Sequence, residues 1–133
     1  MNNKILVVED NPFNLELVTD LLEVAGLSVA SAGTAEEGLR LAREISPGLI
    51  LMDLSLPGMG GLAAIQALKA DPATSHLTVI ALTAHAMKGD KTTAFQRGCD
   101  GYLTKPIDTR TFATEIAGFL AQAKIRRVSR AAA

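Results

Sequence analysis

Short apolar runs alternate along this sequence with longer segments in which apolar residues recur every three or four positions. The short runs are rich in Ile, Val and Leu and predict strands, at residues 4–8, 27–32, 48–52, 77–82 and 101–104. The longer segments have the spacing of amphipathic helices, at residues 12–25, 35–45, 61–70, 88–97 and 109–123. At least three of the strands are apolar on both faces, which is typical of a parallel sheet covered by helices. We therefore predict an α/β fold, a doubly wound (βα)5 three-layer sandwich around one five-stranded parallel sheet.

Residues at the joints between these segments support the predicted boundaries. Thr34 and Asp108 stand just before two of the helices, where a side-chain oxygen can accept hydrogen bonds from free backbone N–H groups. Pro12 falls in the first turn of another helix, where the missing N–H would be unpaired in any case. The remaining prolines also lie between periodic segments, so the chain divides regularly into strands and helices.

The composition is that of a compact globular domain. Of the 133 residues, 48% are hydrophobic and 20% are charged, which excludes a disordered chain, a collagen-like repeat and a coiled coil. The longest strongly apolar runs are about four residues long, against roughly 20 for a membrane span, so we expect no membrane insertion. The amino terminus lacks the apolar stretch of a signal peptide, and Cys99 has no second cysteine to pair with. We expect a cytoplasmic protein.

The net charge of −1 hides an asymmetry between the two ends of the chain. Residues 1–120 contain all 14 acidic residues but only nine of the 13 basic ones, a net charge of −5. The other four basic residues are Lys124, Arg126, Arg127 and Arg130. An acidic body is a poor match for phosphate backbones, so we expect no direct nucleic-acid binding. We predict one domain over residues 1–121 and a basic tail over 122–133 that extends the last helix or is disordered.

Polar residues follow the predicted strands at the carboxyl ends, which is where parallel α/β sheets bind ligands. They are Glu9 and Asp10 after the first strand, Asp53 after the third, Thr83 after the fourth, and Lys105 after the fifth. At the ends of adjacent strands the carboxylates would lie close together. Like charges about 4 Å apart repel each other by about 1 kcal/mol in water and about 4 kcal/mol at an effective dielectric constant near 20, so the pKa of at least one carboxyl group must rise or a cation must bind. Oxygen donors without a nearby Cys or His favour a hard ion, and Mg²⁺ fits best.

The same edge can hold a phosphoryl group. Lys105 supplies a compact cation and Thr83 a hydroxyl donor beside Asp53, whose carboxylate can attack phosphorus and become an acyl phosphate. The sequence contains no Gly-x-x-x-x-Gly-Lys-Ser/Thr loop, no Gly-x-Gly-x-x-Gly motif and no Ser/His/Asp or Cys/His arrangement. The sequence therefore lacks the usual signatures of nucleotide-binding and acyl-transfer enzymes.

Five short motifs give the sequence a resemblance to the receiver domain of bacterial two-component response regulators, in the CheY-like superfamily. Residues 7–11 (VVEDN), 51–59 (LMDLSLPGM) and 103–107 (LTKPI) carry it. Residues 82–90 (LTAHAMKGD) and 98–102 (GCDGY) are similar to DivK-type single-domain regulators and to receiver modules of hybrid histidine kinases. The resemblance covers almost the whole predicted domain and implies a flavodoxin-like strand order, 2-1-3-4-5.

The resemblance also implies a phosphorylation switch. Asp53 would accept a phosphoryl group from a sensor histidine kinase or a histidine phosphotransfer protein. Mg²⁺, or Mn²⁺ in its place, would bind Asp10, Asp53 and the main-chain carbonyl of Ser55, and Glu9 would hold it through a water molecule. Ser55, two residues after Asp53, would also tune the rate of hydrolysis.

Further residues take roles in the switch by the same resemblance. Lys105 would pair with a phosphoryl oxygen, Thr83 would move its hydroxyl onto another, and Tyr102 would rotate inward behind it. A cis peptide bond before Pro106 would aim the lysine. His85, two residues after Thr83, would flank the phosphoryl group and tune its hydrolysis. Downstream proteins would bind the face formed by the fourth helix, the fifth strand and the fifth helix.

We therefore expect a single-domain response regulator that is not an enzyme and signals through phosphorylation-dependent protein binding. The chain ends soon after its last predicted helix, which favours a stand-alone receiver. Two alternatives remain open. The chain could be a module of a hybrid histidine kinase or a larger regulator, or a Mg²⁺-dependent aspartyl-phosphate phosphatase. Against the phosphatase, Ser55 stands where a second aspartate would be needed.

Overall fold

The computed structural model describes residues 3–84 and 88–132, in which strands and helices alternate. The strands are β1 (Lys4–Val8), β2 (Ser28–Ala32), β3 (Leu49–Asp53), β4 (Val79–Thr83) and β5 (Gly101–Thr104). The helices are α1 (Pro12–Val24), α2 (Ala35–Ile45), α3 (Gly61–Ala70), α4 (Lys88–Gln96) and α5 (Phe112–Ala132). All strand pairs are parallel and their order is β2-β1-β3-β4-β5, so the predicted fold class and strand order are confirmed.

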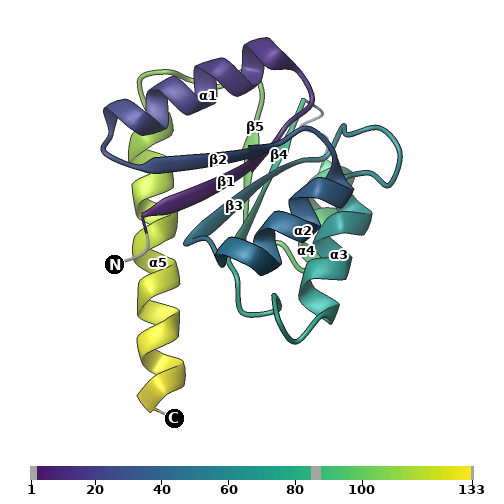
Figure 1. Cartoon of the computed structure of the whole chain (residues 1–133), viewed down its shortest axis with the longest axis vertical. Coiled ribbons are helices and arrows are strands. Elements are labelled where there is room, and N and C mark those ends of the chain that lie inside the picture. Colours follow the sequence, from purple (N-terminus) through teal and green to yellow (C-terminus); the bar gives the residue numbers. More distant parts are fainter. Residues whose placement is uncertain (1–2, 85–87, 133) are drawn as a thin grey trace.

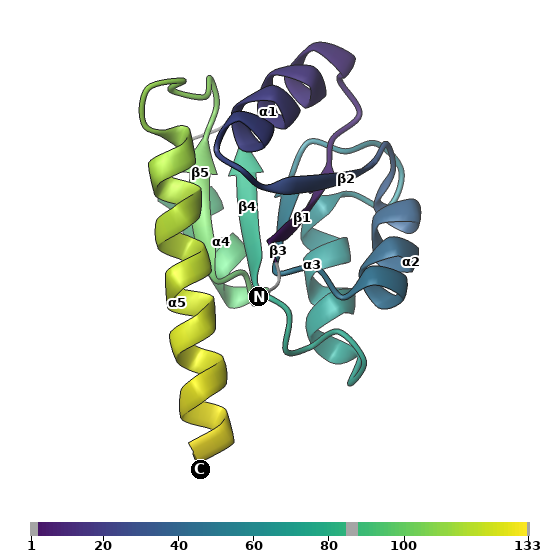
Figure 2. The same ribbon diagram turned by 60° about the vertical axis from the view of Figure 1, so that its left-hand side comes forward.

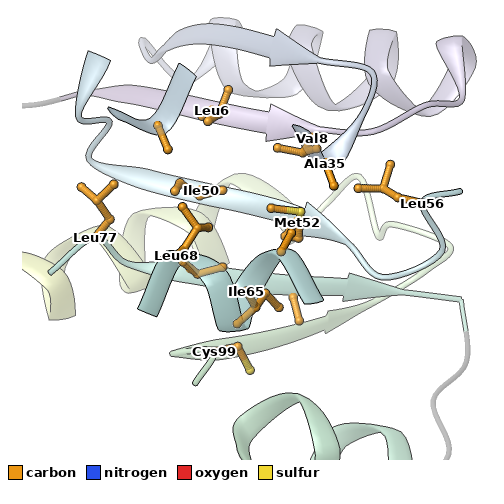
Figure 3. Packing of buried hydrophobic residues seen from close by; sticks show 14 of the residues in the cluster. Leu6, Val8, Ala35, Ile50, Met52, Leu56, Ile65, Leu68, Leu77 and Cys99 are labelled. Atoms are coloured by element: carbon orange, nitrogen blue, oxygen red, sulfur yellow. The ribbon is translucent and has the colours of Figure 1, made fainter. Parts of the chain in front are cut away.

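Helices cover both faces of the sheet. The helices α1 and α5 lie on one face, and α2, α3 and α4 lie on the other (Figure 1). Each face has its own apolar cluster, because successive strand residues point to opposite sides. The cluster under α2 and α3 contains Leu6, Val8, Ile50 and Met52 (Figure 3). The strand β3 is buried along its whole length, so its last residue is held by packing on both sides.

The boundaries of α5 differ from the prediction. The start predicted at residue 109 is wrong, because residues 109–111 form a turn before the helix. The Asp108 carboxylate accepts a hydrogen bond from the Arg110 N–H at 3.0 Å, and its carbonyl accepts one from the Phe112 N–H at 3.0 Å. The helix continues beyond residue 123 to Ala132, so the tail extends the last helix, which is one of the two outcomes that we expected for it.

The carboxyl-terminal part of α5 projects beyond the rest of the molecule (Figure 2). Phe112, Ile116 and Ala123 are buried against the body, each with at most 2% of its surface exposed. Ile125, two residues later, is 65% exposed. Within the described residues, no helix has the length and apolar character needed to span a membrane.

Candidate functional site

Three carboxylates meet at the carboxyl edge of the sheet. Glu9 directly follows β1 and Asp53 ends β3, and the pairing of Val8 with Met52 brings these two strand ends side by side. Oxygens of Glu9, Asp10 and Asp53 all lie within 4.8 Å of one another. The side chains of Glu9 and Asp53 are buried, whereas Asp10 is exposed. The carboxylates therefore form a site that is closed at its base and open to solvent on one side.

Lys105 bridges the two buried carboxylates. Its Nζ donates hydrogen bonds to Glu9 Oε1 at 2.8 Å and to Asp53 Oδ2 at 3.1 Å. The Lys105 N–H also donates to the carbonyl of Thr83 at 2.7 Å, which continues the pairing of β4 with β5 and fixes where the side chain starts. The peptide bond between Lys105 and Pro106 is cis, and Pro106 itself is exposed. The ammonium group of Lys105, which directly follows β5, is thus held beside the carboxylates at the ends of β1 and β3.

The loop after β3 is folded tightly around Asp53. The Ser55 N–H donates a hydrogen bond to Asp53 Oδ1 at 2.9 Å, so the protein contacts both oxygens of this carboxylate. Gly61, the first residue of α3, packs against the same strand end. A Cβ atom at Gly61 would lie 2.3 Å from the Asp53 carbonyl oxygen, a distance that only glycine avoids. The backbone of Asp53 is therefore fixed by a helix that begins directly against it.

The loop after β1 is fixed by a helix cap. Asn11 Oδ1 accepts hydrogen bonds from the N–H groups of Phe13 at 2.9 Å and Asn14 at 3.2 Å, at the start of α1. This cap fixes the chain immediately after Asp10, which is itself exposed. Sequence reasoning missed the positioning roles of Asn11 and Gly61. Two sequence signals could have revealed these roles, namely the Asn that precedes Pro12 at the start of a helix and the Gly-Gly pair at the start of another helix.

The pKa values of the two buried carboxyl groups shift in opposite directions. Burial, and then the adjacent Asp53 carboxylate, raise the pKa of Glu9 to about 7 against the opposing effect of Lys105. Burial also acts to raise the pKa of Asp53, but its hydrogen-bonding neighbours Glu9, Ser55 and Lys105 outweigh it and lower that pKa. Burial acts to lower the pKa of Lys105, and the two carboxylates outweigh it and raise that pKa. Asp53 is therefore the ionised member of the pair, and Glu9 holds a proton more readily.

The donor set fits a hard divalent cation. The three carboxylates supply only oxygen ligands, the chemistry that Mg²⁺ prefers. Among the described residues, Glu9 Oε2 is the buried side-chain atom without a hydrogen-bond partner. A buried carboxylate oxygen in this state is costly unless a cation or a water molecule bound to one satisfies it. An ion here would also reduce the repulsion that Lys105 alone offsets.

Other predicted residues lie on the same edge or near it. Thr83 ends β4 and is buried, one residue after Leu82, which pairs with Asp53. Tyr102 lies on β5, partly buried against the core cluster under α2 and α3. The rate-tuning prediction for His85 falls outside the described residues. Ser55 is exposed beside Asp53, where its N–H rather than its hydroxyl makes the contact described above.

Comparisons with known proteins agree with this geometry. The family model of the response regulator receiver domain matches residues 5–117. The polar-differentiation response regulator DivK of Brucella ovis is 42% identical over 92% of this chain and 100% of its own length. The receiver domain of the sensor histidine kinase PA1611 of Pseudomonas aeruginosa, solved with a magnesium ion coordinated in its active site cleft, is 30% identical with a TM-score of 0.82, covering 91% and 99% of the two chains.

A receiver domain protein (CheY-like) of Methanospirillum hungatei has a TM-score of 0.86 at 26% identity, over 95% of this chain and 99% of its own. The family match spans most of the chain and includes every strand except the first residue of β1. It also includes the carboxylates and the lysine whose geometry is described above. The chain belongs to the response regulator receiver domain family, whose members bind Mg²⁺ in an acidic pocket and act as signalling switches.

Proposed function

We propose that Asp53 accepts a phosphoryl group from a phosphohistidine of a sensor kinase or phosphotransfer protein in the cytoplasm, and that the phosphorylated chain then binds a downstream protein. The observation that supports this most directly is the state of the Asp53 side chain. It is 1% exposed, has a lowered pKa, and is contacted at one oxygen by the Ser55 N–H and at the other by Lys105. An ionised, oriented and largely dry carboxylate is a prepared nucleophile.

In the transfer, a carboxylate oxygen of Asp53 forms a bond to phosphorus while the P–N bond of the donor's phosphohistidine breaks. The imidazole leaves with the electron pair of that bond. Lys105, already within 3.1 Å of Asp53, offsets negative charge on the transferring oxygens. Glu9 keeps the ammonium group on this side of the site by holding it at 2.8 Å.

The cation site is part of the proposal. Asp10, Asp53 and the main-chain carbonyl of Ser55 would bind Mg²⁺ directly, or Mn²⁺ in its place, and Glu9 would do so through a water molecule. When bound, the ion supplies charge compensation for the phosphoryl oxygens. The orphaned Glu9 Oε2 and the three clustered carboxylates support this assignment.

Phosphorylation would change the molecule through charge. A phosphoryl group adds about −1.5 to −2 charge beside Lys105 and Thr83. We assign the ammonium group and the Thr83 hydroxyl as the sensors of that charge, and Tyr102 as the residue that follows Thr83. Lys105 is flanked by Thr104 and Pro106, which line a cavity on the face formed by α4, β5 and α5. A single short segment thus joins the phosphorylation site to the face where we place the downstream protein, and Ser55 and His85 would tune the rate of hydrolysis.

The intact mass of the protein tests the phosphoacceptor. After incubation with phosphoramidate, wild type should gain one phosphoryl group only when Mg²⁺ is present, and Asp53→Asn should gain none. An equal gain in Asp53→Asn would refute the assignment of Asp53. Thr83→Ala should still accept the group but bind its target more weakly in the phosphorylated state, and an unchanged affinity would remove Thr83 from the switch.

A further inference from the structure

Lys69, near the end of α3, joins several segments of the chain at the amino edge of the sheet, opposite the carboxylate site. Its Nζ donates hydrogen bonds to the carbonyl of Leu77 at 2.7 Å and to Asp100 Oδ2 at 2.9 Å. The same Asp100 oxygen accepts a hydrogen bond from the N–H of Val79, the first residue of β4, at 2.9 Å. The Asp100 N–H donates to the Val79 carbonyl at 2.7 Å. We call Lys69, Val79 and Asp100 the anchor, because they tie α3 and β4 to the turn between α4 and β5.

The turn between α4 and β5 is packed against the stem of Lys69. Gly98, in this turn, has a φ of +112°, a left-handed value that favours glycine. A Cβ atom at Gly98 would lie 2.8 Å from Lys69 Cγ, so the backbone passes directly over the lysine side chain. The guanidinium group of Arg97 donates a hydrogen bond to the Gln66 side chain on α3 at 2.7 Å. The carboxyl-terminal end of α4 is therefore fixed to α3.

The strands β4 and β5, which the anchor joins at their amino ends, are closely packed along their length. Gly101, the first residue of β5, pairs with Ile80, and a Cβ atom at Gly101 would lie 2.6 Å from the Phe119 ring and 2.7 Å from Ile80. At the opposite end, the Lys105 N–H donates to the Thr83 carbonyl at 2.7 Å. The two strands are thus held at both ends and form a fixed pair.

The helix α4 buries fewer of its side chains than α3 does. Four residues of α3 are buried, namely Gly61, Ala64, Ile65 and Leu68. In the stretch 91–96 of α4, where the structure describes the side chains, Ala94 is the buried residue and Phe95 is 43% exposed. The nine residues of α4 include Gly89 and the β-branched Thr92 and Thr93, which favour a helix only weakly. A helix this short depends on packing, and the packing that these residues show lies near its carboxyl-terminal end.

We propose that the anchor is a hinge for α4: the carboxyl-terminal end of the helix stays fixed together with β4 and β5, and its amino-terminal end changes position. The helix is about 13 Å long, so a rotation of about 10° at the anchor moves its first turn by about 2 Å. Lys91, on the moving side, lines the cavity on the face formed by α4, β5 and α5. The inference rests on the proposed function for its consequence, since α4 borders the face where we place the downstream protein. The hinge itself needs neither Mg²⁺ nor a phosphoryl group.

Hydrogen exchange of the full chain, without Mg²⁺ or phosphodonor, tests the hinge. The amides of Val79 and Asp100 report on the anchor, because their hydrogen bonds lie within it. The amides of Thr92 and Thr93 report on the moving part of α4. After correction for intrinsic rates, we expect the two α4 amides to exchange at least about tenfold faster than the two anchor amides. Equal protection of both pairs would overturn the proposal, because α4 would then open only together with the anchor.

Lys69→Met tests whether the lysine makes the hinge. The exchange of the anchor amides should rise about tenfold relative to the amides of β3, which report on global unfolding. Asp100→Asn keeps an acceptor for the Val79 N–H but no charge for Lys69, and it should act in the same direction. Arg43→Met is the matched control, because it removes an exposed ion pair to Asp71, directly after α3, and should leave that ratio unchanged.

Two results with these variants would overturn the hinge. In Lys69→Met, an equal rise at the anchor and in β3 would show a loss of overall stability alone. Anchor amides that exchange as slowly as in wild type, relative to β3, would show that Lys69 does not hold the end of α4. A failure of Asp53 to gain a phosphoryl group would refute the proposed function and would leave these exchange rates as they are, so the two failures can be told apart.

Discussion

Replacing Gly61 by alanine should damage the proposed phosphorylation site without changing any side chain in it. The added Cβ would lie 2.3 Å from the carbonyl oxygen of Asp53 and 2.6 Å from Cα of Leu54. Both neighbours are backbone atoms, and the Leu54 N–H is itself bonded to the carbonyl of Leu82 at 2.9 Å. The strand end therefore cannot move freely, and α3 must shift away from it by about 1 Å to reach ordinary contact distance.

The magnitude follows from two opposing effects. Overpacking against a rigid neighbour costs about 1–3 kcal/mol, and the rigid backbone favours the upper half of that range. Alanine in a helix returns about 0.5–1 kcal/mol relative to glycine. We therefore expect Gly61→Ala to lower the free energy of unfolding by about 1–2 kcal/mol. The shift of α3 also moves the loop that joins it to Asp53, in which the Ser55 N–H contacts the carboxylate. Mg²⁺ affinity should therefore fall as well, by about tenfold if the altered geometry costs about 1.4 kcal/mol.

Thermal unfolding with and without Mg²⁺ measures both effects together. The control is Gly33→Ala, because Gly33 is an exposed loop residue where a Cβ would meet nothing within 4 Å. That variant should unfold at or slightly above the wild-type temperature and keep the full stabilisation by Mg²⁺. If Gly61→Ala were as stable as Gly33→Ala and bound Mg²⁺ as tightly, close packing of α3 on β3 would not be what fixes Asp53.

Three further predictions rest on single groups. Because the pKa of Glu9 is raised to about 7 from 4.5, the folded protein holds a proton that the unfolded chain releases, so without Mg²⁺ the unfolding free energy should fall as pH rises from about 5 to 7. Glu9→Gln should flatten that fall in urea titrations, and an unchanged slope would contradict the assignment. Lys69→Met should cost about 1–3 kcal/mol, because Lys69 Nζ donates to the Leu77 carbonyl at 2.7 Å and to Asp100 at 2.9 Å in a partly buried site. The exposed ion pair of Arg43 offers the control, since Arg43→Met should change stability by less than about 1 kcal/mol, and equal losses would refute the distinction. Burial raises the pKa of Cys99 to about 11, so iodoacetamide should label it in urea and not in the native protein, whereas rapid native labelling would place it at the surface.

Much of this architecture could be predicted from the order of residues alone. Buried runs such as residues 48–52 indicate parallel strands, and the rule that such strands end at one edge brings Glu9, Asp53 and Lys105 together before any coordinate is known. The start of α5 could not be predicted, because the side chain of Asp108 can accept backbone hydrogen bonds in a turn as readily as at the start of a helix. The positioning role of Gly61 was equally hidden, since it depends on how closely α3 approaches β3.

Distances within the site are the other part that the sequence leaves open. The predictions placed Lys105 beside Asp53, and its hydrogen bond to Glu9 became apparent only from the structure. That contact matters because it lowers the pKa of Glu9, against burial and the neighbouring Asp53 carboxylate, which raise it. Tyr102 illustrates the same limit, since its spacing locates it on β5 but does not say that it lies against the core.

The bridge made by Lys105 also bears on how the chain folds. The hydrogen bond from Lys105 to Glu9 joins residues 96 positions apart, and the bond to Asp53 spans 52. A partly folded molecule that had assembled β1 and β3 without β5 would bury two acidic groups with no cation between them, and it would be disfavoured for that reason. The first and last strands are therefore coupled, and intermediates that lack β5 are penalised. A nascent chain emerging from the ribosome would complete the group formed by Glu9, Asp53 and Lys105 only after residue 105 had been made.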